Sequence, residues 1–501
     1  MKKIIASILA CALVVTLCGC GKQTEVTTTE TEPYILPTTI IDADVSLPYN
    51  SADSLAPYEA KSDFNRDLMS VLYESLFVQT TDGKGKKLLA SDAVIGDKSV
   101  TVEIVSGVKF SDGTTLTADH VKSSYDLARE NAYYKDSLVN ISSVTVVDSN
   151  TVSFQLYNPD VMVLNTLCFP IAHLSGDGYV GSGKYYIDYL DEVPYLAVNT
   201  SHRNYSGNWN KQIALYDMAG VSSPIYPFKA NEISVYRDDL SDGEYTNLSS
   251  LTVSENMNNL VYIGVNTKWA GTIVSNSWFR RVLNIGINRR DIASKSFLGQ
   301  TDAVSTFFRE DFCGIDDLTR PFLDGNINEA IAILELAGYD SFTDEGIRTN
   351  GSYPLNIRIL VCSVNPYKVG VAEAVKSSLE AMGMGVTIQE AATMEDYIAL
   401  LEEGYFDLYI AETQLTSGYY LDEFFSEDGA LSYGIDEFFF EAYDKYKSGE
   451  FDVETFVWSC NDFVPVIPLF YRKSVVSINP NLSGVNTSGA VYDGVCNWKL
   501  N

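Results

Sequence analysis

Residues 178–184 of this 501-residue chain read GYVGSGK and have the glycine and lysine spacing of a phosphate-binding loop. In such a loop backbone N–H groups hold the phosphates, and a Ser or Thr directly after the lysine binds Mg²⁺. Tyr185 stands at that last position, where its phenol does not replace the aliphatic hydroxyl that the metal needs. The pattern therefore predicts no nucleotide site.

Other catalytic signals in the sequence are missing or unspecific. The chain has no G-x-S-x-G elbow of the kind that carries the nucleophile of α/β-hydrolases. Its three histidines, His120, His173 and His202, are not at metal-ligand spacing, so a histidine-based zinc or nickel cage is not expected. The many carboxylates single out no pair suited to glycoside hydrolysis. We therefore expect no catalytic residue, no metal site and no cofactor, and we expect that the chain is not an enzyme.

The first 20 residues have the pattern of a secretion signal. Lys2 and Lys3 precede an apolar run, 4–17, that is too short to span a membrane, and LCGC follows at 17–20. This pattern resembles bacterial lipoprotein signals, which implies that residues 1–19 are removed and that Cys20 carries the lipid. The alternative is an ordinary signal peptide cut nearby. Residues 20–33, rich in Thr, Glu and Gln, are predicted to form a flexible tether.

The composition restricts the classes of function that remain. The net charge is −31 and 46% of the residues are hydrophobic, so the chain can bury a large core while its acidic surface repels nucleic acid and anionic lipid headgroups. Beyond the signal no apolar run approaches membrane-spanning length. We expect no binding to nucleic acid, no channel or permease function, and membrane attachment through the lipid alone.

Five cysteines follow the signal and lie far apart along the chain. An odd number without close pairs does not form a disulfide framework, although one or two long-range bridges, or five free thiols in a reducing habitat, are compatible with it. The five are Cys168, Cys313, Cys362, Cys460 and Cys496.

The clearest regular pattern lies in the second half. Strand-like alternation at 355–361 is followed by helical spacing at 371–382, a strand at 386–388, a helix at 394–403 and a strand at 406–411. Such a β-α-β-α-β order predicts a doubly wound α/β lobe, with further helices at 277–287 and 328–337. Ligands of such sheets bind outside the carboxyl ends of the strands, so the loop after Ala411 is a candidate binding edge.

The first half differs in pattern. A strand at 100–105, a turn at 107–112 and a hairpin of 144–147 with 151–156 accompany a helix that begins near Ala118, with Thr117 as its N-cap. Short strands with few helices predict an α+β subdomain.

Several long motifs now allow a comparison with a known family. The segments YESL at 73–76, LA at 89–90 and GVKFSDGTTLTADHV at 107–121 closely resemble the signature region of the family-5 solute-binding proteins of peptide and nickel ABC importers. Further matches in the same order are SLAPY at 54–58, GSGKY at 181–185, FRRVLNIGINR at 279–289, LELAGY at 334–339, GYFDL at 404–408 and VIPL at 466–469. In that family the segment at 178–184 is a turn entering a strand, where glycine supplies a positive φ.

The resemblance implies an α/β, two-lobed periplasmic-binding-protein-like fold with an extra α+β subdomain in the first lobe. Lobe 1 is expected to be discontinuous, with residues 34–55, 172–258 and 470–501, the extra subdomain to comprise 56–171, and lobe 2 to comprise 259–469. A ligand would be trapped between the lobes, and binding would bias a two-state hinge.

The resemblance fails at one position near the expected binding edge. Peptide-binding members follow the strand at 406–411 with a Trp and an Ala-Asp-Tyr step, whose Asp pairs with the α-ammonium of the ligand, but Thr416 takes the place of that Asp. A hydroxyl does not replace the charge of a carboxylate in a desolvated cleft, although Glu412 or Asp422 are candidates for that role. Peptides, modified peptides, sugars, metal chelates and other polar solutes stay open. Tyr419 and Tyr420 are either ligand-stacking residues or aromatics packed on the lobe.

The sequence therefore predicts a lipid-anchored receptor on the extracytoplasmic face of the cell membrane. It would capture a peptide or other small polar solute and deliver it to the permease and ATPase of an ABC importer. Two alternatives stay open: a surface sensor or chaperone-like binding protein on the same fold and, last, a surface hydrolase. A neighbouring permease and ATPase gene would favour transport, and turnover of a substrate panel would favour the hydrolase.

Overall fold

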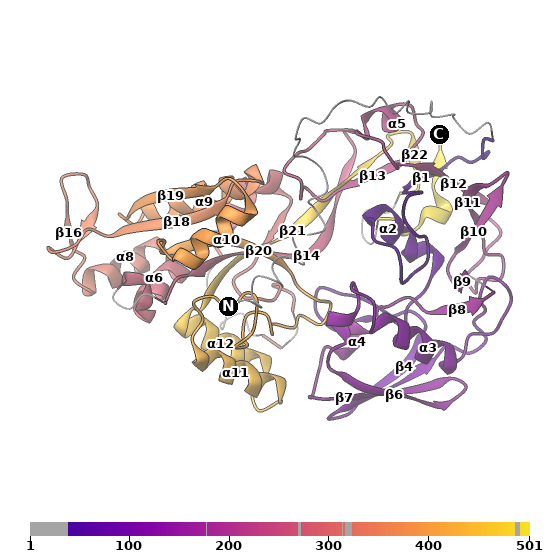
Figure 1. Ribbon diagram of the computed structural model, residues 1–501, viewed down its shortest axis with the longest axis horizontal. Coiled ribbons are helices and arrows are strands. Elements are labelled where there is room, and N and C mark those ends of the chain that lie inside the picture. The colour runs from indigo at the N-terminus through magenta and orange to yellow at the C-terminus, as the bar shows by residue number, and fades with distance from the viewer. Residues whose placement is uncertain (1–38, 177, 269–271, 313, 316–322, 486–490) are drawn as a thin grey trace, which may run out of the picture.

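The computed structural model describes residues 39–176, 178–268, 272–312, 314–315, 323–485 and 491–501. Two lobes lie at opposite ends of an elongated molecule and are joined by two long strands, β14 (Thr252–Val265) and β21 (Val466–Ile478) (Figure 1). We keep the names lobe 1, extra subdomain and lobe 2 for the ranges given above. The predicted two-lobed α/β architecture is confirmed.

Lobe 2 contains the predicted β-α-β-α-β run. The successive elements are β18 (Asn356–Cys362), α9 (Pro366–Glu380), β19 (Gly385–Ala391), α10 (Met394–Glu403) and β20 (Leu408–Gln414). The sheet order is β13-β21-β14-β20-β18-β19, in which β18 is parallel to β19 and β20 while β14 is antiparallel to β20 and β21. The sheet is therefore mixed, because the connecting strands β14 and β21 extend a parallel unit.

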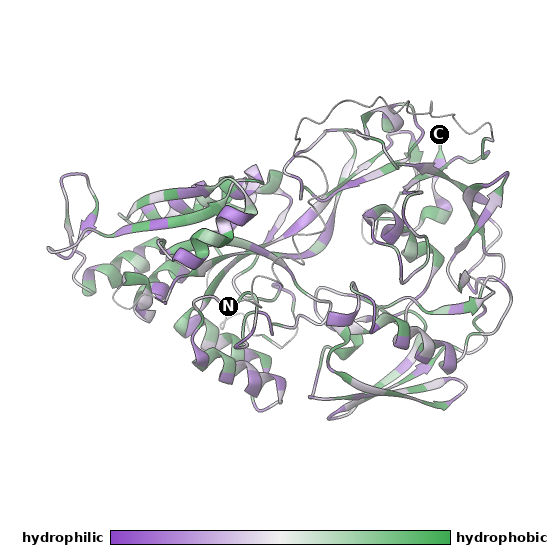
Figure 2. Ribbon diagram, viewed as in Figure 1, coloured by the Kyte–Doolittle hydropathy of each residue, from purple (hydrophilic) through white to green (hydrophobic). Residues whose placement is uncertain are grey.

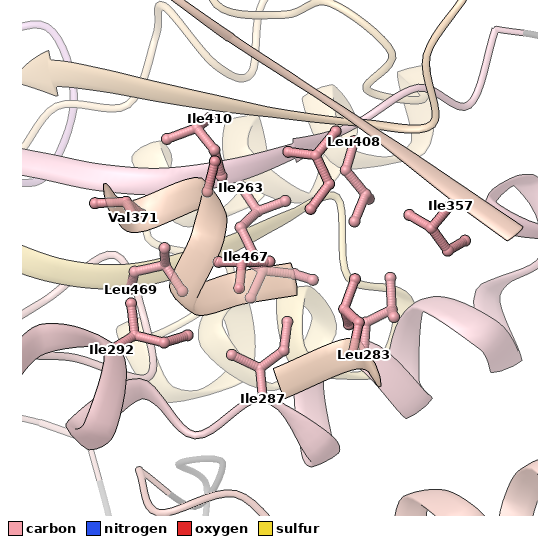
Figure 3. Close-up of a cluster of buried hydrophobic side chains, with 14 of the residues drawn as sticks. Ile263, Leu283, Ile287, Ile292, Ile357, Val371, Leu408, Ile410, Ile467 and Leu469 are labelled. Atoms are coloured by element: carbon pink, nitrogen blue, oxygen red, sulfur yellow. The ribbon is translucent and has the colours of Figure 1, made fainter. Parts of the chain in front are cut away.

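The main core of lobe 2 lies between this sheet and its helices. Figure 3 shows Ile263, Ile357, Leu408 and Ile467 from the strands meeting Leu283 and other apolar side chains from the helices. The covering helices are α6 (Ser277–Gly286), α7 (Arg289–Lys295), α8 (Ile327–Leu336) and α9. Two of them confirm the helices predicted at 277–287 and 328–337.

A second core of lobe 2 is rich in aromatic residues and lies under α11 (Glu437–Lys447) and α12 (Val453–Phe463). It includes Phe307, Phe424, Tyr419 and Tyr471, which are all almost fully buried. This core carries the loop that follows β20, so the candidate binding segment is packed against a rigid support.

The extra subdomain is an α+β unit, as predicted. Its four-stranded antiparallel sheet has the order β4-β5-β7-β6, with bounds Ala90–Ile95, Ser99–Ile104, Thr151–Leu156 and Ile141–Asp148. Helix α3 (Ala118–Ala128) begins after Thr117, whose backbone N–H donates to Nδ1 of His120 at 3.1 Å. His120 therefore has a helix-capping role. The short helix α4 (Val163–Thr166) lies on the side that faces lobe 2 (Figure 1). Two further short strands, β2 (Phe77–Val78) and β3 (Lys86–Lys87), pair with each other.

Lobe 1 is built on a four-stranded sheet of order β1-β12-β11-β10, with bounds Ser46–Tyr49, Gln212–Asp217, Val193–Val198 and Tyr185–Leu190. Helix α2 (Asp63–Leu72) packs on this sheet with Trp498 and other residues near the carboxyl end of the chain. Smaller elements are β8 (Ala172–Ser175), β9 (Gly178–Gly181), α5 (Ile225–Lys229), β13 (Val235–Asp238), β22 (Leu482–Ser483) and β23 (Lys499–Leu500). Lobe 2 adds β15 (Thr301–Ala303), β16 (Ser341–Phe342) and β17 (Arg348–Thr349).

The glycines of the phosphate-loop-like segment have a different role from the one expected. Neither Gly181 nor Gly183 has a positive φ. A Cβ atom on Gly181 would lie 1.9 Å from the carbonyl oxygen of Leu72, and one on Gly183 would lie 2.3 Å from that of Val71. Glycine is required at these two positions because the backbone runs directly along the end of α2, so the expectation of a positive φ was wrong.

The connection between the lobes contains a break in strand pairing. Residues 252–256 of β14 pair with 473–477 of β21, and the regular pairing resumes only at Leu260. At this irregularity each strand keeps a partner on its other edge, because Asn259 pairs with Gln414 of β20 and Arg472 pairs with Thr301 of β15. Leu240, in the segment that leads from β13 to β14, is fully buried in the core of lobe 2 and has a φ of 60°. Packed side chains as well as strand pairing therefore stabilise the connection between the lobes.

Hydropathy follows this architecture. Apolar residues concentrate on the strands and on the inner sides of the helices of both lobes, and polar residues on the outer sides (Figure 2). None of the helices in the described ranges is long and apolar enough to cross a membrane.

Candidate functional site

Glu412 lies in β20 and is the centre of a buried ionic cluster. Its Oε1 accepts from Nη1 of Arg472 at 2.7 Å and from Nδ2 of Asn259 at 2.8 Å, and its Oε2 lies 3.0 Å from Nζ of Lys368. Burial raises the pKa of the carboxyl, but the two cations outweigh burial and hold the pKa of Glu412 below its ordinary value. Both carboxylate oxygens of Glu412 thus have partners within the chain.

Thr416 begins a tight turn after β20. Its Oγ1 accepts from the backbone N–H of Tyr420 at 3.1 Å, and its carbonyl accepts from the N–H of Tyr419 at 3.0 Å. The side chain is half-buried. The hydroxyl at the position of the family's Asp therefore stabilises the loop itself.

Tyr419 is 1% exposed and lies in the aromatic core. Its ring packs edge-on against Phe312, with ring centroids 5.4 Å apart, and lies near the rings of Phe308 and Tyr471. Burial raises the pKa of its phenol, although the Arg309 guanidinium opposes that shift. Tyr419 was predicted either to stack on a ligand or to pack on the lobe, and its position corresponds to packing on the lobe.

Tyr420 points away from that core toward the extra subdomain. Its hydroxyl donates to Oδ2 of Asp160 at 2.7 Å, and Asp160 also accepts from the backbone N–H of Met162 at 2.8 Å. Burial and the neighbouring carboxylate raise the pKa of the Tyr420 phenol well above its ordinary value. The Tyr420 side chain therefore forms a hydrogen bond between lobe 2 and the extra subdomain.

Asp422 lies at the start of the next turn and is paired with a lysine. Its Oδ1 lies 2.9 Å from Nζ of Lys447, and its Oδ2 accepts from the hydroxyl of Tyr443 at 3.1 Å. Its side chain is 47% exposed. Like Glu412, Asp422 already has a cationic partner, and the two carboxylates do not converge on one point.

A pocket of about 540 Å³ opens on lobe 2, and Thr81 of the extra subdomain lies at its edge. Thr81 of the extra subdomain, Asn256 of β14 and Arg309 and Asp311 of lobe 2 are among the residues that line it. Arg309 lies 4.4 Å from the ring centroid of Tyr471, and its Nη1 is 3.1 Å from Oδ2 of Asp302. This pocket presents charges of both signs to a small polar molecule.

The pocket residues were not predicted from the sequence. Arg309 and Asp311 lie between predicted elements and belong to no motif, and only the fold brings them opposite Thr81. Tyr419 supports this wall from behind through Phe312 and Tyr471. A signal in the sequence was the run FFRED at 307–311, in which two aromatic residues are followed directly by three charged residues.

Two further predictions concern cysteines. Cys20 lies outside the described residues, as does Cys313. Cys168, Cys362, Cys460 and Cys496 are free thiols. Burial raises the pKa of the Cys168 and Cys460 thiols, so these two are poor nucleophiles.

Comparison with known proteins identifies the class. The model of the middle region of the bacterial extracellular solute-binding proteins, family 5, matches residues 86–430. This match covers more than half of the chain, and the chain therefore belongs to that family. The predicted family resemblance is confirmed.

Curated relatives match over a shorter range. The glutathione-binding protein GsiB of Escherichia coli is 26% identical over 181 residues, and GsiB of Salmonella paratyphi A is 28% identical over the same length. Each alignment covers 33% of this chain and 35% of the relative, so the match spans about a third of the length of these proteins.

Solved structures match almost the whole chain. The murein tripeptide-binding protein MppA, in an unliganded open form, has a TM-score of 0.70 and 16% identity, with 92% of this chain and 98% of that one covered. A nickel ABC transporter protein from Bacillus halodurans has a TM-score of 0.70 and 15% identity, with coverage of 90% and 98%. The substrate-binding protein CtaP of Listeria monocytogenes has a TM-score of 0.68 and 15% identity, with coverage of 91% and 99%. At these identities the likeness shows the fold.

Proposed function

We propose that this chain is a lipid-anchored extracytoplasmic receptor that captures a peptide or another small polar solute between its lobes and delivers it to an ABC importer. The observation that carries the proposal is the pocket that Thr81 of the extra subdomain, Asn256 of the connecting strand and Arg309 of lobe 2 line together. A solute held there would touch both sides of the hinge, so its binding energy would depend on how the lobes are placed. The family of the chain supports a partnership with a permease and an ATPase.

The anchor is proposed from the signal pattern. The segment LCGC at 17–20 follows a charged and apolar leader, and an acidic chain has little affinity of its own for an anionic membrane. Acyl chains on Cys20 would supply that affinity and keep the receptor beside its importer.

The solute is proposed to be polar and small, with recognition that does not depend on an ammonium contact at Thr416. Glu412 and Asp422 are engaged by Lys368, Arg472 and Lys447, and Thr416 is engaged by its own turn. The names of the relatives, which include a glutathione binder, a tripeptide binder and a nickel transporter protein, support solutes of this size and polarity.

Within the segment 412–422 we propose a division of roles. Thr416, Tyr420 and Asp422 retain partly exposed surface but do not line the pocket, and we propose that they contact the part of a ligand that extends beyond it. Tyr419 and Glu412 are buried, and we propose that they hold the segment in place. Stacking of a ligand on the Tyr420 ring would add to this contact.

Native mass spectrometry of gently purified protein tests the proposal, because a closed receptor retains its ligand. A discrete mass above that of the protein should appear, and adding the identified compound back to stripped protein should raise the melting temperature. A saturating amount of the compound that left the melting temperature unchanged would contradict the solute receptor, and turnover of the compound would favour the hydrolase.

A further inference from the structure

The turn at 416–420 is the place where lobe 2 meets the extra subdomain. Nδ2 of Asn165 donates to the carbonyl of Ser417 at 2.8 Å, and the N–H of Ser417 lies 3.3 Å from Oγ of Ser137. The hydroxyl of Tyr420 donates to Asp160 at 2.7 Å. Three hydrogen bonds thus join two residues of lobe 2 to three residues of the extra subdomain. The partners in each bond are more than 250 positions apart in the sequence.

These contacts are built into the packing. Asn165 is fully buried, and while its Nδ2 binds lobe 2, its Oδ1 accepts from the N–H of Thr80 in the extra subdomain at 2.8 Å. Gly418 approaches α4 so closely that a Cβ atom on it would lie 2.8 Å from Cγ2 of Thr166. The contact is packed as closely as a protein interior, and both polar atoms of the Asn165 amide have hydrogen-bond partners.

A second contact beside the pocket repeats the arrangement. Thr81 of the extra subdomain donates to Oδ2 of Asp311, and a Cβ atom on Gly83 would lie 2.6 Å from the ring of Phe312. Glycine on each side of the interface, Gly83 and Gly418, thus permits the two surfaces to approach. The interface adjoins the pocket, because Thr81 and Asp311 line it.

The contact between the turn at 416–420 and the extra subdomain lies away from the strands that connect the lobes. The lobes are connected covalently through β14 and β21, whose pairing is interrupted between Asn256 and Leu260. In Figure 1, α4 lies beside the loops near α11 and α12, at a distance from the crossing of β14 and β21. Rotation of lobe 2 away from the extra subdomain about these two strands would therefore separate Tyr420 from Asp160.

We propose that the turn at 416–420, together with Ser137, Asp160 and Asn165, is a latch that fastens lobe 2 to the extra subdomain and closes the receptor without ligand. The loop after β20, which was predicted as a binding edge, thus forms part of the closure contact. Thr416 supports the latch through its bond to the N–H of Tyr420. A solute in the adjoining pocket would stabilise contacts that already exist, instead of creating the closed arrangement alone.

X-ray scattering of the ligand-free mature chain tests the latch, and it does so whether or not the proposed transport function is correct. In the double variant Tyr420→Phe/Ser137→Ala, the ratio of latched to open molecules should fall at least tenfold, because a hydrogen bond to a carboxylate and a second bond are lost. The radius of gyration should rise above that of the wild type. Tyr195→Phe is the matched control, since Tyr195 also donates to an aspartate, Asp188, at 3.0 Å, but within the hairpin of lobe 1.

An unchanged scattering profile for the double variant, with native circular dichroism and melting temperature, would overturn the latch. A cross-link gives an independent measurement for the case that the variant does not fold. In a Cys168→Ser background, Ser137→Cys/Ser417→Cys should form a disulfide in the ligand-free chain, because the N–H of Ser417 lies 3.3 Å from Oγ of Ser137. Peptide mapping would locate the bond, and failure of the two cysteines to pair under oxidising conditions would contradict the proposal.

Discussion

Glu412 in β20 and Arg472 in β21 form an ion pair that spans the intervening strand β14, with 2.7 Å between Oε1 and Nη1. Both side chains are buried, at 7% and 2% exposure. On the same strand β14, Asn259 lies in the stretch where the pairing with β21 is interrupted, and its Nδ2 donates to Glu412. The ion pair thus connects β20 and β21 at the point where the backbone pairing between β14 and β21 is interrupted.

The first prediction is that Glu412→Gln lowers the free energy of unfolding of lobe 2 by about 3 kcal/mol at neutral pH. The amide leaves Arg472 and Lys368 buried without a counter-charge, and removing one partner of a buried pair typically costs about 3–5 kcal/mol. Denaturant titration followed by fluorescence measures the loss. Asp422→Asn is the control, because Asp422 pairs with Lys447 at the surface and should change stability by less than about 1 kcal/mol.

The stabilisation by Glu412 should also depend on pH. The folded-state pKa of Glu412 is lowered relative to the unfolded chain, so the unfolded state binds more protons as the solution is acidified. Its contribution is complete above the ordinary glutamate pKa of 4.5 and is lost as the pH falls through the lower folded-state value. The difference between wild type and Glu412→Gln should therefore be constant from pH 7 to about 5.5 and shrink below it; a difference that grew on acidification would contradict this assignment.

A second prediction concerns Tyr419. Tyr419→Ala removes a ring that is 1% exposed and in contact with Phe312 and Tyr471, so it should destabilise lobe 2 by about 3 kcal/mol or more. Tyr419→Phe keeps these ring contacts and should cost less than about 1 kcal/mol. Thermal unfolding of the two variants gives the comparison. Equal stability of Tyr419→Ala and wild type would place this ring outside the core.

The fold was largely predictable from the sequence because its signals are local. Alternation at 355–361, helical spacing at 371–382 and Gly404 after the helix at 394–403 describe β18, α9 and α10 without knowledge of any distant residue. The 14-residue β14 was not predicted, because its pairing with β20 and β21 joins segments about 140 to 225 residues away. Long-range pairing of this kind has no local signature.

The candidate site was less predictable, because its charges are decided by distant partners. Glu412 and Asp422 were candidates for a ligand ammonium, yet each has a cation that only the folded chain brings near it, Lys368 and Arg472 for the first and Lys447 for the second. Tyr419 and Tyr420 are adjacent in sequence but face different surroundings, because Tyr419 has a left-handed φ of 53° that turns the chain between them. A pattern of residue types does not contain this turn.

A third prediction concerns the anchor. Cys20→Ala should release the protein from the membrane fraction, because the acyl chains would supply membrane affinity that a chain of net charge −31 lacks. Fractionation followed by mass spectrometry of the amino terminus tests both location and lipidation. Cys18→Ala is the matched control within the same segment and should leave the lipid on Cys20. Persistence of Cys20→Ala in the membrane fraction would contradict lipid anchoring.

The last prediction concerns the position at which peptide-binding relatives carry an aspartate. Thr416→Asp keeps an oxygen that can accept from the N–H of Tyr420, so the turn should be retained while a negative charge is added beside the latch. Lys368 and Lys447, which contact this segment, are already paired with Glu412 and Asp422. The new carboxylate would thus be available to a ligand ammonium, and peptides with a free amino terminus should bind at least tenfold more tightly than their acetylated forms, a difference of about 1.4 kcal/mol.

Titration calorimetry with one matched peptide pair measures the preference, and Thr416→Asn, which adds the same shape without charge, is the control. Equal affinity of Thr416→Asp for both peptides would mean that position 416 does not face the ligand.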